Sequence, residues 1–394
     1  MGIKILENGN IFDVKEKKIL ENLNIIVEEK KIKEITKDFD PMRYKEAERI
    51  DLKGKYILPG FINSHVHLFL DGSVNIMASL HEDPGIKLLK ATNFALDFLK
   101  AGITTVRDLG GVNYLDISLR DAINKGIVDG PRYLVSGKPV VMTGGHGYFF
   151  AREADGPHEV RKAARENLKK GVDVLKFMAT GGVLTPGVEP GSPQLTYEEL
   201  KAGVEEAHKA GRKAAAHAQG NEGIKNAIRA GIDSIEHGIF LDDEAISMML
   251  DNDTYLVPTL SAGYLIAEEG EEAGIPSYAM EKAKRVMDSY YNSFRMACEK
   301  GVKIAFGTDA GTPLNFHGPV TLEIKLMIKH GMDVWDAFRS ATILASELLG
   351  MDKVIGSIEP GKFADIIAFD ENPLNNLDTL TIPSFVMKDG DVYV

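Results

Sequence analysis

The sequence predicts an α/β protein: a (β/α)₈ TIM barrel accompanied by a small β-sandwich domain built from both chain ends. Two observations predict this architecture. Between residues 58 and 354, short apolar segments alternate with amphipathic helical segments, which is the pattern of a parallel barrel. Residues 1–57 and 355–394 instead contain short alternating apolar runs separated by turn residues, and no amphipathic helical pattern.

The two chain ends each contain strand-like segments. Near the N-terminus these are residues 3–6, 24–27 and 31–35, and near the C-terminus residues 364–369, 384–388 and 391–394. The last two are separated by Asp389-Gly390, a strong hairpin signal. Neither end alone has enough strands for a stable core. We therefore expect residues 1–57 and 355–394 to form one β-sandwich domain.

The central region contains eight strand candidates: residues 57–66, 103–107, 132–136, 172–178, 213–217, 234–236, 254–258 and 302–307. Helical patterns separate them at residues 86–101, 158–170, 197–210, 222–230, 242–250 and 278–300. Several of these end in a glycine suited to a left-handed helix cap. A doubly wound sheet is the alternative, but no glycine-rich phosphate loop follows the first strand. The residues at 264–291 are interpreted as a lid or a subunit contact.

Composition excludes several classes of function. The 394 residues carry a net charge of −12 without a basic stripe, which argues against nucleic acid and anionic membranes as partners. The single Cys298 excludes an internal disulfide framework and a cysteine-based zinc site. No apolar run reaches the ~18–20 residues of a membrane span, and residues 1–30 lack the apolar core of a signal peptide. A cytoplasmic protein is expected.

Histidines and an aspartate stand at the carboxyl ends of several predicted strands. His65 and His67 lie two residues apart on the first strand, so both imidazoles point to one face and can reach one ion. His217 ends the fifth strand, His237 ends the sixth, and Asp309 follows the eighth. The carboxyl ends of barrel strands form the catalytic face. These five residues are therefore candidate metal ligands.

Lys176 interrupts the apolar fourth strand. A lysine in a buried strand is rare unless it is paired or functional. Burial lowers the pKa of its amine and leaves a free amine that can react with CO₂. The resulting carbamate is an anion with two oxygens, suited to bridging two cations. Lys176 is therefore the sixth candidate ligand, as a carboxylated lysine that requires CO₂ or bicarbonate.

Each of these residues alone has a simpler structural explanation. A His-x-His pair is often two satisfied polar side chains, a lone strand-end His or Asp is usually structural, and Lys176 could pair with a carboxylate. Six such residues at the ends of five strands are much harder to explain by chance. The pattern as a whole favours a metal site.

Five segments together resemble the amidohydrolase superfamily, in the branch of imidazolonepropionases and metal-dependent Xaa-Pro dipeptidases and carboxypeptidases. They are LPGFINSHVH (58–67), ADG (154–156), SIEHG (234–238), GTDAGT (307–312) and GSIEPGKFAD (356–365). The resemblance extends over essentially the whole chain. It implies one ion held by His65, His67 and Asp309, a second held by His217 and His237, and bridging by the Lys176 carbamate and a solvent oxygen. Histidine and carboxylate ligands suit Zn²⁺, and also manganese or cobalt.

Two cations that share a water lower its pKa and supply hydroxide near neutral pH. Asp309 is the only carboxylate among the six ligands, so we expect it to be the catalytic proton shuttle from this water to the leaving group.

Four residues are candidates for substrate binding. His146 lies in a glycine-lined loop at 142–147, and in the dipeptidase-like relatives a histidine in a similar loop binds the substrate's carboxylate or carbonyl. Arg152 follows in the same connection, and His317 follows the eighth strand. Gln219 lies two residues after His217 on the same side of the strand end. Prolidase-like relatives often have Tyr there, so Gln219 argues against a strict proline preference.

The sequence therefore predicts a hydrolase that cleaves the amide bond of a dipeptide or an N-acylated amino acid with a free carboxylate. The alternatives are a cyclic amide or lactone hydrolase similar to imidazolonepropionase, and a non-catalytic scaffold of the same fold. Imidazolonepropionase-like members typically use one metal and need no carbamate, so Lys176 argues against them, and a deaminase is disfavoured for the same reason. We expect a small-molecule or dipeptide substrate and a homo-oligomer.

Overall fold

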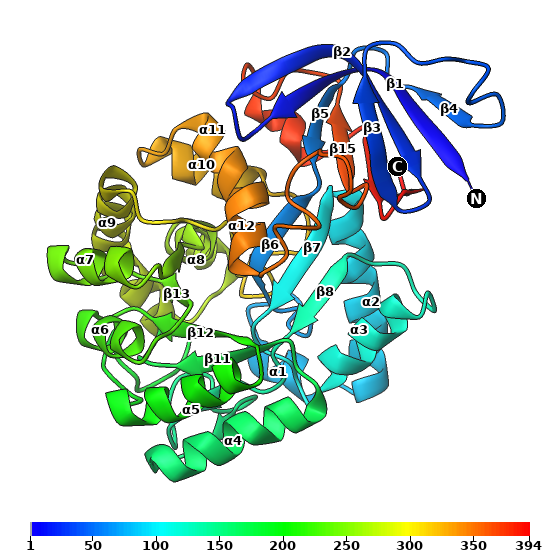
Figure 1. The fold of residues 1–394 in the computed structure, drawn as a ribbon. Helices are drawn as coiled ribbons and strands as arrows, with labels where there is room; N and C mark the ends of the chain where they lie inside the picture. Colours follow the sequence, from blue (N-terminus) through cyan, green and yellow to red (C-terminus); the bar gives the residue numbers. More distant parts are fainter. Residues whose placement is uncertain (1) are drawn as a thin grey trace.

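A computed structural model, which describes residues 2–394, contains a parallel barrel and a β-sheet built from both chain ends (Figure 1). The predicted TIM-barrel type of fold is confirmed. No helix among residues 2–394 is long and apolar enough to cross a membrane.

Seven parallel strands form most of the barrel wall. They are β6 (Phe61–Val66), β7 (Ile103–Asp108), β8 (Arg132–Val135), β11 (Val174–Met178), β12 (Lys213–Ala218), β13 (Ser234–His237) and β14 (Tyr255–Val257). Strands β6 to β8 pair in order, as do β11 to β14, and the short β9 (Val140–Val141) and β10 (Arg152–Glu153) extend the second group. Between the groups, the backbone N–H of Asp173 donates to the carbonyl of Val135 at 2.8 Å.

The eighth predicted strand, residues 302–307, closes the barrel without forming a regular strand. The N–H of Ala305 donates to the carbonyl of Leu256 on one side at 2.9 Å, and the N–H of Ser64 donates to that of Phe306 on the other at 2.8 Å. At Gly307, a Cβ would lie only 2.9 Å from the Cβ of His65. This close approach to the site-bearing strand leaves no room for a side chain at position 307.

Twelve α-helices connect the strands and cover the barrel. They are α1 (Ile76–His81), α2 (Pro84–Lys100), α3 (Leu115–Asn124), α4 (Gly156–Lys170), α5 (Tyr197–Lys209), α6 (Asn221–Arg229), α7 (Asp243–Asp251), α8 (Leu260–Ala273), α9 (Ser277–Lys300), α10 (Thr321–Lys329), α11 (Val334–Arg339) and α12 (Ala345–Leu348). A π-helical turn (Ser340–Leu344) precedes α12, and a 3₁₀ turn (Leu377–Thr381) follows later in the chain.

The six predicted helices are all present as α2, α4, α5, α6, α7 and α9, but α1, α3, α8, α10, α11 and α12 were not predicted. Thr259, the residue before helix α8, has a left-handed backbone conformation, and its side chain does not cap the helix. The Glu323 carboxylate on α10 instead accepts the first two α8 amide protons, from Leu260 at 2.8 Å and Ser261 at 2.7 Å. Local sequence carries no sign of this cap, because its donor and acceptor are 62 or more residues apart.

The terminal strands form one sheet that joins both ends of the chain. It contains β1 (Ile3–Asp13), β2 (Lys18–Glu28), β3 (Lys31–Thr36), β4 (Glu48–Asp51), β5 (Tyr56–Pro59), β15 (Ile366–Phe369), β16 (Phe385–Lys388) and β17 (Asp391–Val392). Strand β15 pairs antiparallel with β5, and β16 and β17 form the hairpin predicted at Asp389-Gly390. Hydrogen bonds connect all eight strands, so the two separate layers of a β-sandwich stay a prediction.

The predicted strand at residues 57–66 is in fact two strands in different sheets. Strand β5 belongs to the terminal sheet and β6 to the barrel, with Gly60 between them. A Cβ at Gly60 would lie 2.2 Å from Thr104 Oγ1. A continuous apolar run conceals this change of sheet, because both strands are buried on both faces.

A buried carboxylate at the start of α3 predicts a pH-dependent stability. Burial, followed by the nearby Asp108 carboxylate, raises the pKa of Asp116 from 3.8 to about 7. Protonated Asp116 therefore stabilises the fold at low pH, and this stabilisation is lost as the pH rises from about 4 through about 7. In Asp116→Asn the group stays neutral, so the free energy of unfolding at pH 8 should exceed that of wild type by up to about 4 kcal/mol.

Urea unfolding of both metal-free proteins between pH 4 and pH 8 measures this difference, which should vanish near pH 4. The exposed Asp97→Asn is the matched control and should follow wild type throughout. A difference between Asp116→Asn and wild type that does not change with pH would contradict the assignment.

Candidate active site

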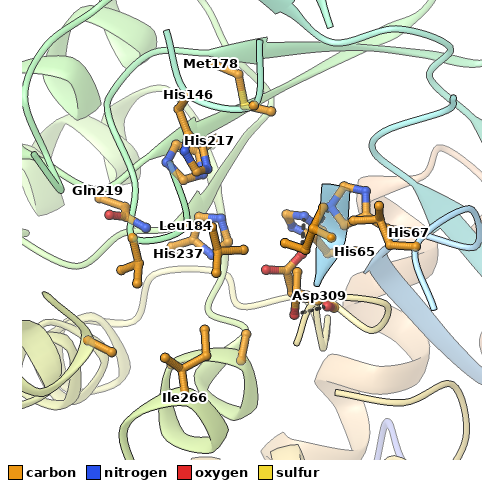
Figure 2. A pocket seen from close by; sticks show the side chains of 18 of the residues that line it. His65, His67, His146, Met178, Leu184, His217, Gln219, His237, Ile266 and Asp309 are labelled. Atoms are coloured by element: carbon orange, nitrogen blue, oxygen red, sulfur yellow. Dashed lines mark hydrogen bonds and ion pairs between the residues drawn. The ribbon is translucent and has the colours of Figure 1, made fainter. Parts of the chain in front are cut away.

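The predicted ligands converge in one pocket at the carboxyl ends of the barrel strands (Figure 2). His65, His67, Lys176, His217, His237 and Asp309 all line it. Residues of helices α8 and α9 line part of the same pocket, so the segment at 264–291, predicted as a lid or a subunit contact, borders the site. The remaining wall is largely apolar and includes Leu70, Ile76, Phe149, Phe150, Leu184, Ile266 and Val286.

Asp309 faces two imidazole nitrogens. Its Oδ1 lies 3.2 Å from Nε2 of His65 and 3.1 Å from Nε2 of His67. The Nδ1 of His65 lies 2.8 Å from the Glu236 carboxylate, which can only accept when ionised, so the proton of a neutral His65 is on Nδ1. Nε2 of His65 and the Asp309 oxygen are then both acceptors, and they repel unless a positive charge lies near them.

This arrangement fits a metal cation. Ligand atoms of His65, His237 and Asp309 lie within 4.8 Å of one another. Burial raises the pKa of Asp309, but when no cation is bound, His65 and His67 in their protonated forms lower it further through charge and hydrogen bonds, so the net pKa lies well below its usual range. Asp309 is consequently an anion at neutral pH.

A buried network holds His65 in place. Arg107 on β7 donates from Nη2 to Glu236 Oε1 at 3.0 Å and from Nε to the carbonyl of Ser64 at 2.6 Å. Burial raises the pKa of Glu236, yet the Arg107 charge and the His65 hydrogen bond lower it well below its usual range. The ionised carboxylate orients the His65 ring, which is the usual support for a metal-binding histidine.

His237 and His217 offer one nitrogen each to the same space. The Nδ1 of His237 lies 2.7 Å from Thr259 Oγ1, which directs Nε2 into the pocket. The Nε2 of His217 lies 3.3 Å from the carbonyl of Gly181, which leaves Nδ1 free. The two rings are 4.7 Å apart. Both side chains can therefore bind one ion.

Strained backbone accompanies these side chains. His237 has φ +73°, Asp309 has φ +60° and the β-branched Thr259 has φ +47°. Residues other than glycine rarely adopt these angles, and where they occur they cluster at functional sites. At the ends of β13 and the eighth segment, the turn directs each side chain toward the pocket.

Lys176 is buried on β11, with 1% of its surface exposed. Among residues 2–394, no carboxylate lies within ion-pair distance of its amine. Burial lowers the pKa of Lys176 to about 8, which makes the neutral amine accessible near neutral pH. A buried amine without a partner suits carboxylation, because the modification replaces an unpaired cation with an anion beside the metal ligands.

Burial also keeps the imidazoles of the site neutral. It lowers the pKa of His237 to about 3, that of His146 to about 4, and that of His217 well below its usual value. Neutral imidazole is the form that binds a metal. The site is thus ready for metal at neutral pH without loss of a proton from these rings.

Two of the four predicted substrate-binding residues line the pocket. His146 lies beside His217, with ring centroids 4.4 Å apart, and its Nδ1 is 2.9 Å from Thr185 Oγ1. Gln219 is buried, and its Oε1 has no hydrogen-bond partner among the described residues. Both side chains have polar atoms available for a ligand.

The other two lie elsewhere. Arg152 donates to Glu166 at 2.9 Å and to Glu159 at 3.2 Å, and these α4 carboxylates hold its guanidinium outside the pocket. The Nε2 of His317 lies 3.0 Å from the carbonyl of His67, and its ring stacks on Phe94 at 4.3 Å. His317 therefore supports the ligand-bearing segment from behind, and the structure does not bring either residue to a substrate.

Sequence reasoning missed the supporting residues of the site. Arg107 and Glu236 are charged residues in apolar strands, the same signal that identified Lys176, so they could have been found. Thr259, Thr185 and Tyr290 carry no such signal, because hydroxyl residues are common at strand ends and on helices.

Comparison with known proteins agrees with these features. The sequence model of the amidohydrolase family matches residues 56–394. An ochratoxinase of Aspergillus niger is 30% identical over 408 aligned residues, which cover 95% of this chain and 83% of that protein. An imidazolonepropionase of Geobacillus kaustophilus is 25% identical, with 89% and 86% coverage.

Two solved structures are similar over nearly their full length. The structure of a Xaa-Pro dipeptidase with methionine bound in its active site superimposes with a TM-score of 0.93, at 37% identity and 100% coverage of both chains. A prolidase in complex with N-methylphosphonate-L-proline has a TM-score of 0.92, at 30% identity and 99% coverage of both. From the family match and these relatives, we conclude that this chain belongs to the amidohydrolase family.

Proposed function

We propose that this protein hydrolyses the amide bond of a dipeptide or an N-acylated amino acid, with two divalent cations held at the mouth of the barrel. As an amidohydrolase-family protein it is a hydrolase of amide or peptide C–N bonds. The observation that carries the finer proposal is the convergence of six candidate ligands in one pocket. The bridging function of Lys176 requires its carboxylation.

The donor set suits a pair of cations. Nε2 of His65 and that of His67 face the Asp309 carboxylate, and His217 and His237, whose ring centroids are 4.7 Å apart, present free nitrogens to the same pocket. Zn²⁺ is the proposed metal, since imidazole and carboxylate donors suit it. When bound, the cations would polarise the scissile carbonyl and lower the pKa of a water molecule shared between them.

The protein's own residues then have distinct functions. The Asp309 carboxylate accepts a proton from the attacking water and passes it to the leaving nitrogen. His146 and Gln219 present polar atoms to the substrate's carbonyl or carboxylate. The apolar wall around Phe150, Leu184 and Ile266 excludes bulk water and accommodates an uncharged side chain.

A dipeptide and N-acyl amino acid library tests this proposal. The full-length protein is purified with zinc and bicarbonate, and free amino acids are detected after incubation. We expect release of the C-terminal residue from part of the library and about two metal ions per chain by elemental analysis. Chelation should abolish hydrolysis, and added zinc should restore it.

Other outcomes separate the alternatives. Hydrolysis only of ring amides or lactones, with one ion per chain, would support a function like that of the imidazolonepropionase relative. No bound metal and no hydrolysis would support a non-catalytic scaffold. A Lys176→Met variant should bind fewer ions, whereas Lys138→Met, outside the pocket, should match wild type.

A further inference from the structure

A buried threonine contacts the one pocket histidine that is not a candidate metal ligand. His146 lies in the loop after β9, and its Nδ1 is 2.9 Å from Thr185 Oγ1, which belongs to the loop after β11 (Figure 2 shows His146 beside His217). Thr185 has 1% of its surface exposed. No described protein group lies within hydrogen-bonding distance of His146 Nε2, whose ring lines the pocket.

The hydrogen bonds of the Thr185 hydroxyl determine which tautomer a neutral His146 adopts. The backbone N–H of Gly147 donates to Thr185 Oγ1 at 3.1 Å. Because this group is a donor, it cannot accept the proton of the Thr185 hydroxyl. The only other polar contact of this hydroxyl among residues 2–394 is His146 Nδ1. A buried hydroxyl that left its proton unused would be destabilising. The hydroxyl therefore donates to Nδ1, and a neutral His146 carries its proton on Nε2.

The candidate ligand His237 also contacts a threonine, Thr259, but its proton is on Nδ1 and not on Nε2. Tyr290 donates its proton to the carbonyl of Pro258, so the Thr259 hydroxyl donates to Tyr290 Oη, 3.1 Å away. Thr259 Oγ1 is then free to accept the proton on His237 Nδ1. His237 Nε2 keeps a lone pair for a cation, whereas His146 Nε2 carries a hydrogen.

We propose that Thr185 is a positioning residue that holds His146 as an Nε2–H donor toward an oxygen of the substrate. This inference rests on the proposed amide hydrolysis for its kinetic consequence, but the tautomer itself does not depend on it. Two further features favour a fixed geometry. Lys282 on α9 donates to the carbonyl of Thr185 at 3.1 Å, and a Cβ at Gly182 would lie 2.6 Å from His146 Nε2.

Paired substitutions provide the kinetic test. Thr185→Val keeps the shape of the side chain but removes the hydroxyl, and Thr185→Ser retains it. With the substrate found in the library, kcat/KM of Thr185→Val should fall about tenfold, the usual effect of one neutral hydrogen bond. Thr185→Ser should recover most of the loss. Thr143→Val, which removes a hydroxyl from the loop that carries His146 but contacts Asp155 and not His146, is the control and should match wild type.

A double-mutant cycle distinguishes positioning from a general structural function. In a His146→Ala background, Thr185→Val should cause no further loss, because the histidine that it orients is absent. An equal loss in both backgrounds would overturn the proposal, as would unchanged activity of Thr185→Val in the wild-type background.

The ring ¹⁵N chemical shifts of zinc-loaded protein labelled at histidine provide a readout without substrate. The His146 signal is assigned by its disappearance in His146→Gln. A protonated Nε2 in wild type, with a shift toward a mixture of tautomers in Thr185→Val, supports the proposal, and a protonated Nδ1 in wild type overturns it. If no amide is hydrolysed, the proposed function fails while the spectra still decide the tautomer.

Discussion

Asp309→Asn is expected to lower kcat by roughly 10²–10⁴-fold, the range for the loss of a general acid–base group. The wild-type carboxylate is ionised at neutral pH, because contact with His65 and His67 holds its pKa well below the usual value despite burial. An amide in its place can contact the same neighbours but cannot accept a proton. We expect most of the metal to remain, since the other five candidate ligands are unchanged.

The measurement combines steady-state kinetics with elemental analysis of the same preparation. Asp71→Asn is the matched control, because Asp71 follows the same barrel strand as His65 and pairs with Lys90. It should leave kcat close to that of wild type. Full turnover of Asp309→Asn with metal retained would exclude Asp309 as the proton shuttle.

Arg107→Met should lower the free energy of unfolding by about 3–5 kcal/mol, the cost of leaving a buried charge without its partner. Glu236 has no exposed surface, and Arg107 supplies its only guanidinium contact among the described residues. Without that charge, the pKa of Glu236 should rise, and the carboxylate should hold His65 less firmly. Activity should therefore fall together with stability.

Urea unfolding of the metal-free proteins at neutral pH measures this effect. The double variant Arg107→Met/Glu236→Gln should be more stable than the single variant, because it leaves no buried charge unpaired. Arg49→Met, which breaks an exposed pair with Glu7, is the control and should stay near wild type. A single-variant loss below about 1 kcal/mol would show that the buried pair is not needed for stability.

The convergence of the six candidate metal ligands could be predicted because each depends on a local rule. Alternation along a strand places His65 and His67 on one face, and the parallel barrel brings all strand ends to one opening. A lysine in an apolar strand such as that of Lys176 is visible in the sequence without any knowledge of its neighbours. The pocket contains all of these side chains.

The candidate substrate-binding residues converge less completely, because only His146 and Gln219 line the pocket. Arg152 and His317 lie on connections near the barrel mouth, but Glu159, Glu166 and the carbonyl of His67 hold them outside the pocket. The position of a loop side chain depends on the hydrogen-bond or ion-pair partner that it contacts, and that partner lies in another element. Sequence position alone does not identify it.

The sequence by itself therefore determined the barrel, the meeting of the two chain ends and the convergence of the six candidate metal ligands, since all three follow from strand periodicity and residue chemistry. Tertiary structure alone decided which nitrogen of each histidine is free, because Glu236, Thr259 and Thr185 reach their rings from other strands and loops. It also decided the irregular course of the eighth segment and the start of α8, where Glu323 accepts the first two amide protons. Hydrogen bonds between residues distant in sequence set these features, and no local pattern encodes them.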